Sequence, residues 1–156
     1  MTWAGHEYLM IYKQKTWKTH KIKSWGLALW MIKDISKLLK EKELLFEVWD
    51  IAVLYSDWIT EAIDREKRDW NEQMFGEDKL IKAIHSAPNM KNKQYKSARS
   101  VYNNITINLS QHMWYKPLQL DDVTLAVIQY KPEDYMSEND FPEEIPEEIL
   151  TAWNWK

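Results

Sequence analysis

Ten tryptophans stand against three glycines in this 156-residue chain, and this imbalance limits the turns that the chain can make. Average glycine usage of about 7% would give roughly eleven glycines. Most of the tryptophans follow neither the two-residue period of a strand nor the 3.6-residue period of a helix. The tryptophans in this group are Trp3, Trp17, Trp25, Trp30, Trp49, Trp58, Trp70 and Trp114.

Three of these tryptophans stand where turns are expected. Trp17 separates two alternating apolar runs, and Trp49 and Trp58 bound the apolar run 51–55. Such positions favour glycine, which reaches positive φ without steric cost. We therefore hypothesise that the eight tryptophans are glycines in the natural protein, because the codon UGA is read as Trp in some genetic codes and as Gly in others. The alternative is a protein that uses tryptophan for core packing or as an interfacial belt.

The length of the chain indicates one domain, and its composition excludes several classes of function. The net charge of −3 and the pI near 5.8 leave no basic footprint for nucleic acid. The absence of cysteine removes disulfides, thiolate zinc sites and cysteine nucleophiles. No apolar run approaches the ~18 residues of a membrane span, and the start does not resemble a signal peptide. We expect a cytoplasmic protein with neither nucleic acid nor membrane as its partner.

Hydrophobic periodicity predicts an α+β fold with antiparallel pairing. The first two predicted strands form a hairpin about Trp17, and the next two form a hairpin about Trp49 and Asp50. A glycine-rich loop is expected at 24–30 if tryptophan is read as glycine, and a second loop at 64–73. The predicted strands are 7–12, 20–23, 44–48, 51–55 and 123–130. The predicted helices are 60–63, a stripe at 80–84, and 94–113.

Carboxylates at strand ends are the main chemical signal. Asp57 follows the apolar run 51–55, and Asp121 and Asp122 precede the last predicted strand. Carboxylates that meet in this way can hold hard divalent cations, although a lone aspartate at a strand end is usually a turn residue. The scattered histidines form no zinc motif, and no nucleophile elbow or glycine-rich phosphate loop is present.

With tryptophan read as glycine, five motifs follow one another along the chain: Ala4-Gly5-His6, Trp49-Asp50, the run 54–62 around Ser56-Asp57-Trp58, Phe75-Gly76-Glu77 and Asp121-Asp122-Val123-Thr124. In this order they resemble the PPM-type serine/threonine phosphatases, specifically their SpoIIE-like bacterial branch. The resemblance runs from residue 2 to about residue 130. We therefore expect the C-terminal portion of a phosphatase domain at 1–131 and an acidic, proline-containing tail at 132–156.

The resemblance implies an α-β-β-α sandwich with two antiparallel sheets and a site for two divalent cations, Mg²⁺ or Mn²⁺. It implies that Asp57 and Asp121 are metal ligands and that Asp122 is their neighbour. It assigns no catalytic side chain, because water on the metal ions attacks phosphorus directly. The residues expected to keep the structure of the motifs are Gly5, His6, Asp50 and Gly76.

The implied substrate is a protein phosphorylated on serine or threonine, as in bacterial signalling. The family's first metal motif is expected upstream of Ala4, so this polypeptide alone is expected to be inactive. Its expected partners include the missing N-terminal half or an upstream sensor domain. One alternative is a non-catalytic, phosphatase-like module that binds a regulatory partner. A membrane-surface binder is disfavoured by the strand pattern of the Trp- and Lys-rich front half.

If these residues are tryptophan, as the sequence is written, we expect strain in the backbone. Trp58 would follow a metal ligand at a turn that requires positive φ, at a cost of about 1–3 kcal/mol for each such site. Several sites of this kind would consume much of the ~5–15 kcal/mol that stabilises an ordinary domain. The sequence as written is therefore expected to fold poorly.

Overall fold

The computed structural model describes residues 7–23, 43–64, 74–90, 93–113 and 123–131. In these ranges the chain forms four strands and three helices. No helix among them is long and apolar enough to cross a membrane. The elements are β1 (Leu9–Lys13), β2 (Lys18–Ile22), β3 (Ile51–Tyr55), α1 (Asp57–Thr60), α3 (Gly76–Ser86), α4 (Ala98–His112) and β4 (Leu125–Gln129).

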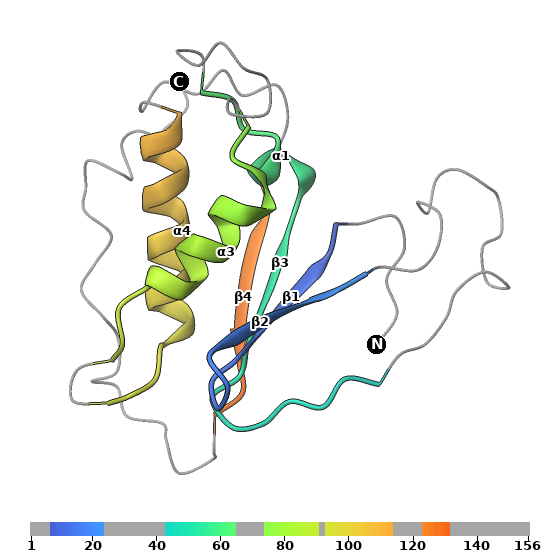
Figure 1. The fold of residues 1–156 in the computed structure, drawn as a ribbon, viewed down its shortest axis with the longest axis vertical. Helices are drawn as coiled ribbons and strands as arrows, with labels where there is room; N and C mark the ends of the chain where they lie inside the picture. The colour runs from blue at the N-terminus through green and yellow to red at the C-terminus, as the bar shows by residue number, and fades with distance from the viewer. Residues whose placement is uncertain (1–6, 24–42, 65–73, 91–92, 114–122, 132–156) are drawn as a thin grey trace, which may run out of the picture.

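The strands form one antiparallel sheet in the order β2-β1-β3-β4 (Figure 1). Strand β1 pairs with β2 on one side and with β3 on the other, and β3 pairs along its whole length with β4. The predicted α+β class with antiparallel pairing is confirmed. The second sheet of the expected sandwich stays a prediction, since the described residues make up a single sheet.

Helices α3 and α4 lie against one face of this sheet (Figure 1). The alternation of side chains along a strand explains the core between them. The inward-facing strand residues and the apolar stripes of the two helices form one buried cluster. Its members include Met10, Tyr12, Ile51, Val53, Leu80, Ile84, Val101, Ile105 and Leu109.

The opposite face of the sheet is also apolar. Leu9, Ile11 and Ala52 are buried there, and they pack with Leu44 and Phe46 of the segment 43–48. The two central strands are therefore covered on both faces, which explains why their sequences are almost continuously apolar instead of alternating.

Part of the strand prediction is wrong. The hairpin about Trp17 is present, with ends shifted by one or two residues, and the strand predicted at 123–130 is present as β4. The segment 44–48, however, is not a strand. Strand β3 takes β1 and β4 as its partners, and the Glu47 backbone N–H donates to the Asp50 carboxylate at 2.8 Å, which closes a turn where the hairpin was expected.

The helix stripe at 80–84 is confirmed by α3, whereas two predicted helix starts are wrong. Helix α1 begins at Asp57 instead of residue 60, directly after Ser56. Helix α4 begins at Ala98 instead of residue 94, because Ser97 and Ser100 form a reciprocal capping box that sets its first turn. The predicted loop at 24–30, residues 65–73 of the second loop and the tail at 132–156 lie outside the described residues.

Two tryptophans have the positive φ that the glycine hypothesis expects, and a third does not. Trp17 and Trp49 have φ values of 57° and 75°, close to the 69° of Gly76. This is the left-handed region, which a residue with a Cβ rarely adopts. Trp58 instead lies in the first turn of α1 and has no positive φ, so the strain expected there is absent. The other tryptophans of the group lie outside the described residues.

Candidate metal centre

Asp57 lies at the end of the sheet where β3 gives way to α1. Its side chain is exposed, and its Oδ1 accepts the backbone N–H of Trp58 at 2.9 Å. The hydroxyl of Thr60 donates to the Asp57 carbonyl at 2.9 Å and holds the short helical turn. The backbone of Asp57 is therefore fixed by strand β3 on one side and by helix α1 on the other.

The start of β4 lies beside Asp57. Tyr55 pairs with Leu125 in the sheet, and the next residues outward, Ser56 and Thr124, are joined by two hydrogen bonds. The segment that enters β4 therefore meets β3 at the residue before Asp57. Asp121 and Asp122, which precede this segment in the sequence, lie outside the described residues, as do Gly5 and His6.

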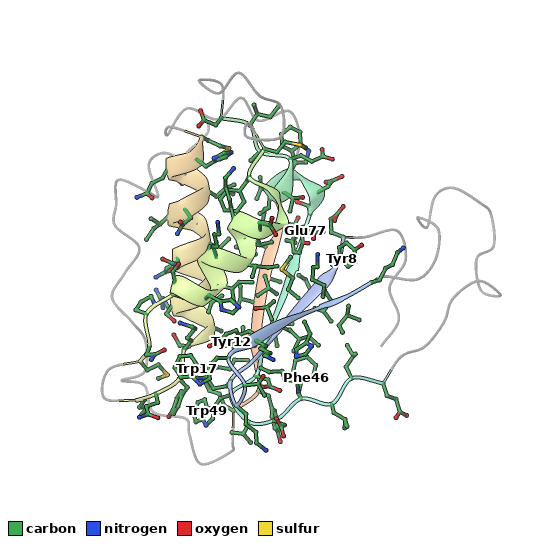
Figure 2. The ribbon with its side chains drawn as sticks, in the orientation of Figure 1. Tyr8, Tyr12, Trp17, Phe46, Trp49 and Glu77 are labelled. Carbon is green, nitrogen blue, oxygen red and sulfur yellow. The ribbon has the colours of Figure 1, made fainter. Side chains whose placement is uncertain are left out.

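Several other acids surround this end of the sheet. The pKa of Glu7 is raised by burial first, and then by the negative charges of Glu77, Asp57 and Glu61. Glu77 stands beside Tyr8 in Figure 2 and forms an ion pair with Lys21 at 2.7 Å. The hydrogen bond to Glu77 and its charge together raise the pKa of Lys21. Glu7, Asp57, Glu61 and Glu77 therefore bring several negative charges to this end of the sheet, and Lys21 is paired with Glu77.

Tyr55 connects this acidic region to the core. Its ring is buried, and its hydroxyl has no hydrogen-bond partner among the described residues. Burial raises the pKa of Tyr55, and the charges of Glu77 and Glu7 raise it further. Tyr55 therefore stays a neutral phenol at physiological pH and adds no charge to the site.

The described donors suit Mg²⁺ or Mn²⁺ in kind, since both ions prefer carboxylate oxygens and water. They do not form a complete cage. Within the described ranges, no group of three or more His, Cys, Asp or Glu side chains is placed to hold a metal ion. Of the two expected ligands, only Asp57 is placed by the structure.

Asp50 lies far from Asp57, at the other end of β3. Its carboxylate is fully buried, forms an ion pair with Lys13 at 2.6 Å, and accepts the Gln14 backbone N–H at 3.1 Å. Six residues lie between Asp50 and Asp57, five of them in β3, which gives a span on the order of 20 Å. These contacts join the β1–β2 hairpin to the turn before β3, so Asp50 supports the fold at a distance from the candidate metal centre.

Gly76 is the first residue of α3, and its φ of 69° suits a glycine at that turn. The next residue, Glu77, faces the acidic end. Sequence reasoning named Glu77 and Ser56 only as members of motifs, and it missed Glu7. No local spacing could have brought Glu7 and Glu77 together, since about 70 residues separate them.

The fold and this site define an α+β protein with an exposed aspartate at an acidic end of an antiparallel sheet. The family model described as Stage II sporulation protein E (SpoIIE) matches residues 1–131. The chain therefore belongs to the SpoIIE family, whose members are PPM-type phosphatases. No curated protein and no solved structure matches the chain.

Proposed function

We propose that the chain is part of a metal-dependent protein serine/threonine phosphatase, in which Asp57 and Asp121 are ligands of two divalent cations, Mg²⁺ or Mn²⁺. The observation that carries the proposal is the pairing of Ser56 with Thr124, directly beside Asp57. Asp121 precedes Thr124 by three residues, and three residues of chain reach at most about 11 Å. Asp122 is proposed as a neighbour of the site.

The chemistry of this centre needs no protein nucleophile. Two bound cations lower the pKa of a bridging water and shield the charge of the phosphate. The residues of the chain have a positioning role: Asp57 offers an oxygen from a rigid strand end, while Glu7, Glu61 and Glu77 provide a negative field that favours cation entry. The absence of cysteine agrees with attack by water.

The proposed substrate is phosphoserine or phosphothreonine on a regulatory protein. Membership of a phosphatase family supports this class of substrate. Two carboxylates alone hold Mg²⁺ loosely, since that ion keeps most of its waters. We therefore expect the isolated chain to bind Mn²⁺ weakly and to show no turnover of a phosphoserine peptide. Mn²⁺-dependent turnover that Asp57→Ala abolishes would contradict the second expectation.

Mn²⁺ titration of the full chain, followed by the electron paramagnetic resonance signal of the free ion, tests the proposal. Asp57→Asn should weaken binding by about tenfold or more, because it removes a ligand charge. Asp78→Asn is the matched control, since Asp78 is an exposed acid in the first turn of α3. It makes the same change of charge at the same end of the molecule, away from the strand end.

Equal losses in the two variants would show that Asp57 acts only through its charge. Failure of the unaltered chain to bind Mn²⁺ would instead favour the alternative function, a non-catalytic module that binds a regulatory partner.

A further inference from the structure

The two edge strands of the sheet differ in charge. The order β2-β1-β3-β4 leaves β2 and β4 at the edges (Figure 1). Strand β2 carries Lys18 and Lys21, and lysines on an edge strand discourage its pairing with another chain. Strand β4 has no charged residue, no proline and no glycine, and this neutral run extends over residues 123–130. Of the two edges, β4 is therefore the one suited to accept a further strand.

The outer edge of β4 has backbone groups without a strand partner. The N–H groups of Thr124 and Tyr130, at its two ends, both donate to the β3 side, at 3.1 Å and 3.2 Å. In an antiparallel pair every second residue bonds to the same neighbour, so the even-numbered residues of β4 face β3. Among the described residues, no strand pairs with β4 on its other side. The residues whose N–H and C=O groups point to that open side are Leu125, Val127 and Gln129.

One face of β4 is also uncovered. Ala126, Ile128 and Tyr130 are exposed, and they alternate with residues that are half-buried against the helices. Ile128 lies opposite Ala52, which is buried on the face that the segment 43–48 covers. The apolar face of the sheet therefore continues from β3 onto β4, where Ile128 is 57% exposed. The open edge and the exposed apolar side chains lie on the same strand.

We propose that β4 is a self-association surface, on which the β4 strands of two copies of the chain pair antiparallel and join their sheets. The register follows from the backbone. The groups at the open edge belong to odd-numbered residues, and Val127 is the middle of the strand. A two-fold axis at Val127 therefore pairs all five residues, with Leu125 opposite Gln129 of the second copy. This inference does not depend on the candidate metal centre.

The side chains of β4 are complementary to themselves in this register. On the exposed face, Ile128 of one copy lies opposite Ala126 of the other, and Tyr130 lies opposite Thr124. Each large side chain therefore faces a small one, and no like charges face each other across the contact. A contact of one strand pair is smaller than the interfaces of standard stable complexes, so a weak dimer is expected.

Sedimentation velocity and amide hydrogen exchange of the full chain test the proposal. The average mass should rise from 18.9 kDa toward twice that value as the concentration increases from roughly 1 μM to 1 mM. Over the same range, exchange at the Val127 N–H should slow by about tenfold or more, because this group enters a hydrogen bond at the new strand pair. The Ile128 N–H faces β3 and should be protected at every concentration.

Three variants test the strand and its register. Ile128→Lys places a charge on the exposed face of the edge strand and should weaken the dimer by about tenfold or more. Leu45→Lys is the matched control, since Leu45 is 87% exposed and its carbonyl is bonded to Lys13 of β1, away from β4. It should leave the dimer unchanged. Ile128→Lys combined with Ala126→Glu places opposite charges across the two-fold axis and should restore most of the lost affinity.

A full chain that stays a monomer at every concentration would overturn the proposal, and would show that another segment of the chain or another protein covers this edge. A dimer in which exchange at Val127 does not slow would also overturn it, because the contact would then lie elsewhere. The same holds for an equal loss in Leu45→Lys, or for a double variant no stronger than Ile128→Lys. Exchange in the unaltered chain decides the question even if a variant folds poorly.

Discussion

Replacing tryptophan by glycine should stabilise the chain where the backbone is left-handed and nowhere else. Trp17 and Trp49 have φ values of 57° and 75°, whereas Trp58 lies in the helix α1. A residue with a Cβ in the left-handed region costs about 1–2 kcal/mol. Glycine avoids this cost, although it loses about 0.5–1 kcal/mol of backbone entropy relative to alanine.

The clean comparison is glycine against alanine at the same position, since both variants lose the indole. At Trp17 the glycine variant should be the more stable by about 1 kcal/mol, and the same holds at Trp49. At Trp58 the order should reverse, with alanine favoured by up to about 1 kcal/mol, because glycine is a poor helix former. A difference of 1 kcal/mol corresponds to about 3 °C in Tm for a chain of this length.

Relative to tryptophan itself, the two left-handed sites differ. Trp17 is 48% exposed, so its truncation to glycine loses little packing, and a net gain is expected. Trp49 stacks on Tyr95 with ring centroids 4.1 Å apart. A stacked pair contributes about 0.5–1.5 kcal/mol beyond the area that it buries. The relief of strain at Trp49 is therefore largely offset, and Trp49→Gly should be close to neutral.

Thermal unfolding followed by circular dichroism measures these differences. The reasoning is refuted if alanine and glycine variants melt together at Trp17, or if glycine is equally favoured at Trp58. Codons provide a separate check on the origin of the tryptophans, since UGG at all eight positions would exclude a UGA reassignment.

Two further predictions concern stability. Asp50→Ala should destabilise the chain by about 3 kcal/mol, because it removes the buried carboxylate that pairs with Lys13 and accepts two backbone N–H groups. A loss of stability below 1 kcal/mol in urea unfolding would contradict the role given to Asp50. Burial, and then the charge of Lys96, lower the pKa of His85 from its ordinary 6.5. Protonation of His85 therefore favours the unfolded chain, so its contribution is complete above about pH 6.5 and falls as the pH drops below that value. His85 is exposed by surface area, so the effect is small. The fall in Tm between pH 7.5 and 5.5 should be smaller in His85→Gln, and an equal fall would contradict this account.

The spacing of apolar residues predicted the elements that depend on neighbouring residues in the sequence. The β1–β2 hairpin, helix α3 and strand β4 follow from apolar spacing and from acids at a helix start. The segment 44–48 has the apolar residues of a strand, but the Glu47 backbone N–H donates to the buried Asp50 carboxylate. The spacing of apolar residues in the sequence cannot reveal this contact. The helical conformation of Trp58 could not be predicted either, because β3 ends at Tyr55 and α1 begins at Asp57, with Ser56 alone between them.

The candidate site was predictable only in part. Asp57 was identified from its place after an apolar run and from the motif around it. Its acidic neighbours Glu7 and Glu77 come from distant parts of the sequence, and only the packing of β1 and α3 brings them near. The hydrogen bond from the Thr124 N–H to the Ser56 hydroxyl depends on the register between β3 and β4, which the sequence does not specify.

The central claim is that Asp57 and Asp121 hold a divalent cation together. A double-mutant cycle of Mn²⁺ affinity, with Asp57→Asn, Asp121→Asn and the double variant, measures this directly. If both aspartates bind one ion or a coupled pair of ions, the double variant should lose little more affinity than either single variant, because the site is already broken. Independent losses that add in the double variant, or an unchanged affinity in Asp57→Asn, would contradict the shared metal centre.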